Sequence, residues 1–429
     1  MQPVRPRGRR PHRWCVALLA VVALLTTACS AKRRATVVPP PTGTSPTATV
    51  TATASQPSQA PSTVTPAPST AKPSSAAKSP TPAATKPPTT APPAVSGPQA
   101  SAFPIAANFP TALAFAPDGR LFWTERAGNV MVYQNGAAKV FATVSTVTTE
   151  AGGGYSERGL LGLAISPTFT TDHFVYAFYS DANRSTQHVV RWTDSGGTGT
   201  ASKTILTYPA GGDCCHKGGR LVFGPTDGKL YVTLGEEHNP DQAQTVTSPL
   251  GKVLRYNPDG SVPPDDPFAA QGSAAWAYGF RNPFGIAISP SGQMALTVNG
   301  PTGDDNSPST GFDTVIFSVT KGGDYQWPEC YGYSHPLEAD PCPGSLIAPD
   351  YSTEASTFVP TGATFVDAAG PSGAAGHLVF CTLNDGGMIY TPGSPHGTVA
   401  PGPANCRLDV KQGPDHALYY SDTGKIYRN

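Results

Sequence analysis

Residues 220–236, RLVFGPTDGKLYVTLGE, decide the fold. Apolar residues alternate on both sides of a Gly-Pro-Thr-Asp-Gly segment, so this stretch predicts two antiparallel strands joined by a tight turn. The same pattern recurs along the chain: three close copies begin at Ala112, Gly285 and Arg407, and two looser copies begin at Gly162 and Thr361. Six irregular repeats of a strand pair predict an all-β fold, a six-bladed β-propeller. A β-sandwich, the competing all-β fold, does not explain the repeats.

The residues before the first repeat have a different composition. Residues 1–29 combine a basic start, an apolar run over 16–25 and Cys29 after small residues, which is the pattern of a bacterial lipoprotein signal peptide with Cys29 as the lipidated residue. A plain cleaved signal is the alternative. Residues 30–101 consist almost entirely of Pro, Thr, Ser and Ala, which predicts a disordered, semi-stiff linker. Residues 102–429 then form the propeller, which we expect at the extracytoplasmic face of the cell membrane.

The charge balance excludes one class of partner. The chain has 29 basic and 29 acidic residues, so its formal net charge is zero. No basic block lies outside the signal, and we therefore expect no nucleic-acid partner. We expect a monomer that is attached to the membrane only through its lipid anchor.

The cysteines indicate an oxidising compartment. Six remain after the signal peptide and Cys29 are set aside. Their positions predict a vicinal disulfide between neighbours, a second disulfide that brackets one loop, and a third that joins the last two repeats: Cys214–Cys215, Cys330–Cys342 and Cys381–Cys406. A metal site is the alternative, although paired Cys-x-x-Cys spacing is missing.

Three segments contain side chains suited to catalysis. His216 lies at the mouth of a Gly-rich turn, and the carboxylate of Glu236 closes the strand pair that follows. The second segment, YGFRNPFG at 278–285, brings a guanidinium and an amide, and the third, NGPTGDD at 299–305, brings a Gly-Pro turn beside two aspartates. A base, a guanidinium and a turn of this kind predict a redox or acid–base site held on β-structure. A structural histidine and a solvated face at Glu236 and Glu237 are the alternatives.

With these segments in view, the domain resembles the soluble quinoprotein glucose and aldose sugar dehydrogenases, the glucose/sorbosone dehydrogenase family. The matching segments follow the order of the family: 157–169, 216–236, 250–268, 278–285, 299–305 and 321–329. The resemblance implies a six-bladed propeller that holds pyrroloquinoline quinone (PQQ) and Ca²⁺ at one end of its channel. It also implies oxidation of an aldose sugar at the anomeric carbon.

The resemblance assigns the catalytic roles residue by residue. His216 falls where the family has its general base, and an imidazole suits that role because its pKa lies near working pH. Glu236 takes the place of a carboxylate that orients this histidine. Arg281 and Asn282 match the pair that contacts the quinone, where Arg281 would stabilise growing negative charge.

The resemblance also implies a cofactor and metal set. Gly300 and Pro301 match the turn whose main-chain carbonyls bind calcium, a hard cation that prefers oxygen ligands. Asn299, which we assign to cofactor binding, stands where the family often has Gln. Tyr325 matches a cofactor-site tyrosine that follows the calcium loop.

Departures from the family concern the carboxylates of PQQ, which need cationic partners. Asn384 replaces a lysine, and Cys406 and Leu408 replace two arginines. Arg407 lies between the last two and, by strand alternation, should face the other way. A second hypothesis follows from these losses: a non-catalytic, lipid-anchored propeller that acts as a binding or scaffold protein of the cell envelope.

Overall fold

The computed structural model describes residues 98–211, 214–303 and 306–429. These residues belong to one compact unit, Ala91–Asn429. The signal segment, Cys29 and most of the linker lie outside the described residues, so the expectations about them stay predictions. Among the described residues, no helix has the length and apolar character of a membrane span.

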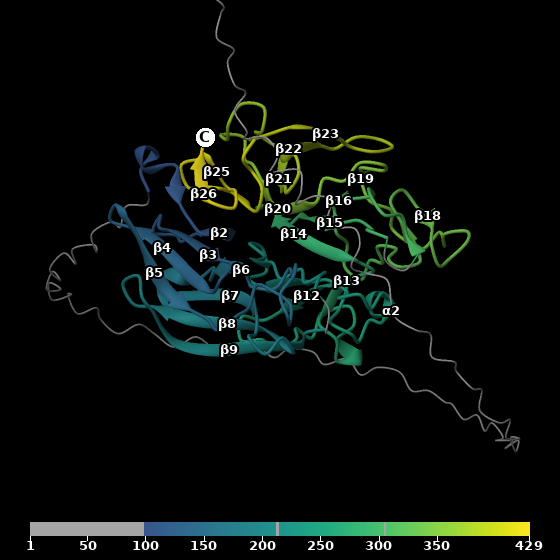
Figure 1. Cartoon of the computed structure of the whole chain (residues 1–429), viewed down its shortest axis with the longest axis horizontal. Helices are drawn as coiled ribbons and strands as arrows, with labels where there is room; N and C mark the ends of the chain where they lie inside the picture. The colour runs from purple at the N-terminus through teal and green to yellow at the C-terminus, as the bar shows by residue number, and fades with distance from the viewer. Residues whose placement is uncertain (1–97, 212–213, 304–305) are drawn as a thin grey trace, which may run out of the picture. The chain divides into compact units, whose positions relative to one another are not determined.

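Six four-stranded antiparallel sheets form the blades of a propeller (Figure 1). The first three blades follow the chain in order: β2 (Pro110–Phe115), β3 (Leu121–Glu125), β4 (Asn129–Gln134) and β5 (Ala137–Thr143); β6 (Leu160–Ile165), β7 (Phe174–Ser180), β8 (Thr186–Asp194) and β9 (Gly199–Pro209); β10 (Leu221–Phe223), β11 (Leu230–Leu234), β12 (Lys252–Tyr256) and β13 (Ala275–Tyr278). The prediction of a six-bladed propeller is confirmed, and the sandwich alternative is wrong.

The remaining three blades depart from this regular order twice. A hairpin is inserted into the fourth blade, and a strand from the start of the domain is the outermost strand of the sixth blade. Their strands are β14 (Asn282–Ile288), β15 (Met294–Asn299), β16 (Thr314–Ile316) and β19 (Tyr351–Ser352); β20 (Pro360–Phe365), β21 (Leu378–Thr382), β22 (Gly386–Thr391) and β23 (Thr398–Pro401); β24 (Val410–Gln412), β25 (Leu418–Ser421), β26 (Lys425–Arg428) and β1 (Ile105–Ala106). A small hairpin, β17 (Cys330–Tyr331) and β18 (His335–Pro336), interrupts the fourth blade. The helices are single turns: η1 (Ala100–Ala102), α1 (Phe169–Asp172), α2 (Asp241–Gln244) and η2 (Ala269–Gln271).

Each predicted repeat corresponds to the two inner strands of one blade. In the third blade, β10 and β11 pair in register from Leu221↔Val232 to Phe223↔Leu230. The turn between them is closed by Asp227, whose Oδ1 accepts the Lys229 amide at 3.0 Å, and by Gly228, which has a positive φ of 64°. Glycine adopts this conformation without steric cost, which explains the Asp-Gly signature of the repeat.

The ring closes through strands from both ends of the domain. The inner strands β2, β6, β10, β14, β20 and β24 contact one another in succession around the axis. In the sixth blade β1 forms the outermost strand and pairs antiparallel with β26 through Ile105↔Ile426 and Ala106↔Lys425. Large side chains such as Trp123, Tyr176, Phe178 and Tyr419 are fully or almost fully buried between the sheets. Burial of such aromatic surface is the main source of stability for the ring.

A charge cluster of two buried side chains, Arg220 and Asp409, and the partly exposed Lys411 lies at the axis. Arg220, just before β10, donates Nε to the Phe284 carbonyl at 2.9 Å, Nη2 to the Leu408 carbonyl at 2.9 Å and Nη1 to the Thr111 carbonyl. Asp409 accepts the Leu113 amide at 2.8 Å and the ammonium of Lys411 at 3.3 Å. Lys411 also reaches the Ala363 carbonyl at 2.9 Å. The cluster thus connects inner segments of five different blades.

The three disulfides have the predicted pairing: Cys214–Cys215, Cys330–Cys342 and Cys381–Cys406. The second links β17 to the loop that follows β18. The third joins β21 to the segment just before β24, so it connects the fifth and sixth blades. Disulfides of this kind stabilise a domain chiefly by restricting the unfolded chain.

Candidate active site

The candidate residues of the third and fourth blades lie on connections at one end of the propeller or, like Asn282 and Asn299, at the strand ends beside them. His216 and Arg281 precede the inner strands β10 and β14, and Glu236 and Gly300 follow the second strands β11 and β15. In a blade of four antiparallel strands, the connection into the first strand and the connection after the second lie at the same end. The topology therefore brings together residues that are far apart in sequence.

His216 and Glu236 form a buried pair. The Nδ1 atom of His216 is hydrogen-bonded to Glu236 Oε1, and the two side chains are 4% and 0% exposed. Gly235 makes this approach feasible, because a Cβ there would lie 2.2 Å from the His216 carbonyl oxygen. The pairing that the family resemblance implies is present: Glu236 engages Nδ1, and Nε2 is the ring nitrogen on the opposite side.

A second pair lies one residue further along both segments. Lys217 Nζ lies 3.0 Å from Glu237 Oε2, and the two side chains are 0% and 1% exposed. Burial lowers the pKa of Lys217 and raises the pKa of Glu237, and the ion pair opposes both shifts. Glu237 also accepts the Gly211 amide and the Gln187 side-chain amide. The hypothesis of a solvated face at Glu236 and Glu237 is therefore wrong.

Arg281 and Asn282 approach the same region from the fourth blade. Asn282 Oδ1 accepts the Gly218 amide at 3.2 Å, and its Nδ2 donates to Glu157 Oε2 at 3.1 Å. The Arg281 carbonyl accepts the Glu236 amide at 2.9 Å. This backbone hydrogen bond ties the His216–Glu236 pair to the residue that carries the guanidinium. Arg281 is 3% exposed, and its Cζ atom lies 5.7 Å from the centre of the Trp327 ring.

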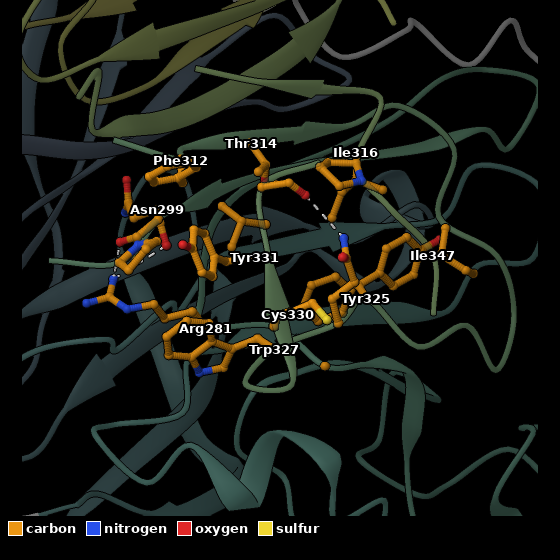
Figure 2. A pocket seen from close by; sticks show the side chains of 18 residues that line it. Arg281, Asn299, Phe312, Thr314, Ile316, Tyr325, Trp327, Cys330, Tyr331 and Ile347 are labelled. Carbon is orange, nitrogen blue, oxygen red and sulfur yellow. Dashed lines mark hydrogen bonds between the residues drawn. The ribbon is translucent and has the colours of Figure 1, made fainter. Parts of the chain in front are cut away.

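A cleft opens beside Arg281 (Figure 2). It has about 420 Å³ of empty volume, including its open mouth, and Arg281, Asn299, Gly300, Pro301 and Trp327 line it. Arg281 donates to the Gly300 carbonyl at 2.5 Å and to Thr302 Oγ1 at 2.9 Å. Thus the guanidinium already contacts one carbonyl that the resemblance assigns to calcium.

Asp313 holds the Gly300 turn in place through hydrogen bonds from backbone amides. Its Oδ1 accepts the Gly300 amide at 2.8 Å, and its Oδ2 accepts the amides of Phe358 and Val359 at 2.7 and 2.9 Å. Burial raises the pKa of Asp313, while these backbone donors oppose that shift. The aspartates 304 and 305 after the turn lie outside the described residues.

Tyr325 lies at the inner end of the cleft. Its ring stacks on Phe280 with centroids 5.0 Å apart, and its hydroxyl accepts the Thr320 amide at 2.9 Å. The hydroxyl also donates to the Ser318 carbonyl at 3.3 Å. The structure therefore gives Tyr325 a packing role, and its contact with a cofactor stays a prediction.

The opposite side of the same end lacks cations at the three expected positions. Asn384 donates to the Thr357 carbonyl at 3.1 Å, Cys406 forms a disulfide with Cys381, and Leu408 is buried. Arg407 lies in the irregular segment before β24, so the strand alternation expected there is wrong, and its guanidinium donates to the Leu383 carbonyl at 2.9 Å, next to Asn384. The departures found in the sequence are therefore real differences in side-chain chemistry at this end.

Sequence reasoning missed two residues of the site. The sequence analysis assigns no role to His238, but its ring packs against that of His216, with centroids 4.0 Å apart and the planes tilted by 31°. Glu157 accepts both the Lys217 amide and the Asn282 side chain, each at 3.1 Å. Glu157 lies in the family-like segment 157–169, and this position is the sequence feature that could have indicated its place in the site. No sequence feature indicated His238, because its position depends on a loop conformation with positive φ at Glu237 and His238.

The chain is similar to known proteins in sequence and in fold. Quinoprotein glucose dehydrogenase B of Acinetobacter calcoaceticus is 32% identical over 260 residues, which are 53% of this chain and 51% of that protein. The chain thus spans about half the length of the curated relatives it matches.

Solved structures cover more of their own length. The structure of a Thermus thermophilus oxidoreductase described as a glucose dehydrogenase is 29% identical, with a TM-score of 0.64 over 75% of this chain and 96% of that one. The PQQ-bound aldose sugar dehydrogenase of Streptomyces coelicolor shares the fold at 24% identity and a TM-score of 0.62, over 79% and 99% of the two chains. The glucose/sorbosone dehydrogenase family profile matches residues 107–428. The chain belongs to the glucose/sorbosone dehydrogenase family.

Proposed function

We propose that this protein is a PQQ-dependent dehydrogenase that oxidises an aldose sugar at its anomeric carbon, with His216 as the base. The observation that carries the proposal is the buried His216–Glu236 pair beside Arg281, in a chain of this family. The names of its relatives support a sugar as the substrate class and PQQ as the cofactor.

The residues present fit PQQ at the side of the third and fourth blades. Two buried polar atoms there, Asn299 Oδ1 and Trp327 Nε1, have no hydrogen-bond partner among the described residues. Together with the guanidinium of Arg281 they offer an acceptor, a donor and a positive charge to a planar, oxygen-rich ligand. At the side of the fifth and sixth blades, Asn384, Cys406 and Leu408 supply no charge, so we expect weaker binding of a polycarboxylate.

The chemistry of the chain's own residues follows from their contacts. Oxidation of the sugar to a lactone removes the hydroxyl proton and, from carbon, one hydrogen with two electrons; bound PQQ would supply the two-electron acceptor. His216 Nε2 takes the hydroxyl proton. Glu236 holds the opposite nitrogen, orients the ring and stabilises the imidazolium that forms. Arg281 places positive charge where an oxygen of the acceptor gains negative charge.

The proposal also includes a bound calcium ion and attachment to the membrane. The carbonyls of Gly300 and Pro301 are ligands suited to Ca²⁺. Because Arg281 now contacts the Gly300 carbonyl, calcium would have to share or displace that contact. We further propose that the lipidated Cys29 attaches the enzyme to the extracytoplasmic face of the cell membrane, with residues 30–101 as the tether.

One set of observations favours a second function. The three uncharged positions Asn384, Cys406 and Leu408 are what a propeller without a quinone would carry. In that case the protein is a lipid-anchored binding or scaffold protein of the cell envelope. The two functions differ in one measurable property, which is whether the purified propeller binds PQQ.

The decisive experiment titrates the purified protein with PQQ and Ca²⁺ at low salt and follows quinone absorbance and aldose-dependent dye reduction. We expect saturable binding, and His216→Ala should lower turnover by about 10²–10⁴-fold. His377→Ala is the matched control, since His377 lies on the connection between β20 and β21, at the other end of the blade. If wild type binds no PQQ at high micromolar concentration, the dehydrogenase proposal fails and the scaffold proposal takes its place.

A further inference from the structure

The vicinal disulfide lies beside the ring of His238, which packs against His216. The sulfur atoms of Cys214 and Cys215 and a ring nitrogen of His238 all lie within 4.8 Å of one another, and all three residues are partly exposed. Two thiolates and an imidazole are ligands that Zn²⁺ and similar soft metal ions prefer. A disulfide cannot supply them, because its sulfurs are bonded to each other.

The two arms that carry these ligands are held in place by other contacts. On the cysteine arm, the Cys214 carbonyl accepts the Glu157 amide at 2.9 Å and the Ser156 hydroxyl at 3.3 Å. On the histidine arm, the buried Lys217–Glu237 pair fixes the preceding residue, and the Asn239 amide donates to the Glu236 carbonyl at 2.9 Å. Cleavage of the disulfide would therefore release two thiols at positions that the backbone still defines.

We propose that Cys214, Cys215 and His238 form a latent soft-metal site that reduction of the disulfide opens. A dithiol reductant transfers two electrons and two protons to the Cys214–Cys215 bond, giving two thiols and the disulfide of the reductant. A divalent ion then displaces the two thiol protons and is bound by two thiolates and the imidazole. Zn–S distances of about 2.3 Å place two thiolates of one tetrahedral site roughly 3.8 Å apart, so the ligand atoms need to move by only about 1 Å.

The position of this site gives it a consequence for catalysis. The ring of His238 packs against that of His216, with centroids 4.0 Å apart and the planes tilted by 31°. A metal ion on His238 would add positive charge next to the base and would fix the ring against which the base packs. Reduction and metal binding should therefore lower the activity of the proposed dehydrogenase, whereas the binding itself does not depend on that function.

The test measures metal binding to the protein without any quinone. Purified wild type is reduced with a dithiol under mild conditions, freed of reductant without air, and titrated with Cd²⁺, whose thiolate complexes absorb in the ultraviolet, and with Zn²⁺ in competition with a coloured chelator. We expect one equivalent to bind to the reduced protein and none to the oxidised protein. His238→Ala should weaken binding at least about 10-fold.

Two double variants assign the site. Cys214→Ser with Cys215→Ser should abolish binding, while Cys330→Ser with Cys342→Ser should retain it, which controls for a second disulfide with a partly exposed cysteine. Mass spectrometry adds a measurement on wild type alone: Zn²⁺ should protect Cys214 and Cys215 of the reduced protein from alkylation. Equal binding by oxidised protein, loss in the 330/342 variant but not in the 214/215 variant, or unprotected Cys214 and Cys215 would each overturn the proposal.

Discussion

Removal of the axial guanidinium should destabilise the whole ring. In Arg220→Met the carbonyls of Phe284, Thr111 and Leu408 lose a charged donor that is 4% exposed. Each hydrogen bond to a charged group contributes about 1.5–3 kcal/mol, but water that enters the axis will replace some of them. Breaking a buried ionic cluster by removing one member typically costs about 3–5 kcal/mol, and we take this range for Arg220.

That range converts to a melting shift through the size of the domain. At about 2.1 cal/mol/K per residue, the matched 107–428 region has an unfolding entropy of roughly 0.7 kcal/mol/K. Arg220→Met should therefore lower Tm by about 4–8 °C. Arg220→Lys keeps the charge but not the planar guanidinium, so its Tm should lie between those of wild type and Arg220→Met.

Differential scanning calorimetry with a matched denaturant titration measures this shift. Lys203→Met is the control, because it removes one positive charge from an exposed position on β9. Its Tm should stay within about 1 °C of wild type, as for most surface substitutions. An Arg220→Met protein that melts together with wild type would refute the idea that the axial cluster holds the blades together.

Three other predictions follow from the site, the third blade and the start of the chain. Burial lowers the pKa of Lys252 to about 7, so the unfolded chain binds more protons than the native protein between pH 7 and about 10. The free energy of unfolding should therefore rise with pH over that window. Denaturant titrations at several pH values should show a flatter dependence of this free energy on pH for Lys252→Met. Asn384→Lys should tighten PQQ binding at low salt and make it more salt-dependent, as measured by quinone titration, while unchanged affinity would contradict a role for charge at this position. Cys29→Ala should move the protein from the membrane fraction to the soluble fraction or block its processing, and unaltered partition in cell fractionation would disprove lipid anchoring.

The fold could be predicted because its signal is local. Each inner strand pair carries alternation and an Asp-Gly or related turn within about 20 residues, as in residues 220–236, and such features depend on neighbours in sequence. Outer strands carry less of this signal, since they have more polar, solvent-facing positions. β9, for example, is mostly exposed along its eleven residues. The hairpin β17–β18 is an insertion without a counterpart in the other repeats.

The site could be predicted only where the chain keeps the family's segments. His216, Glu236, Arg281 and Asn282 lie in such segments, and the structure brings them together at one end. The contact of His238 with His216 depends on backbone conformations of a short loop, which no residue pattern encodes. The role of Arg220 was equally hidden, because its partners come from three other blades and only the closed ring assembles them.

The pairing of β1 with β26 has a consequence for how the protein is made. Ile105 is synthesised 321 residues before its partner Ile426 (426 − 105). The sixth blade therefore stays open at its outer edge until β26 has been synthesised, and the unpaired edge strand can join another chain in the meantime. Contacts over such long sequence separations also form slowly. Closure of the ring therefore waits for β26, and a nascent chain that is kept unfolded until β26 is available avoids pairing with other chains.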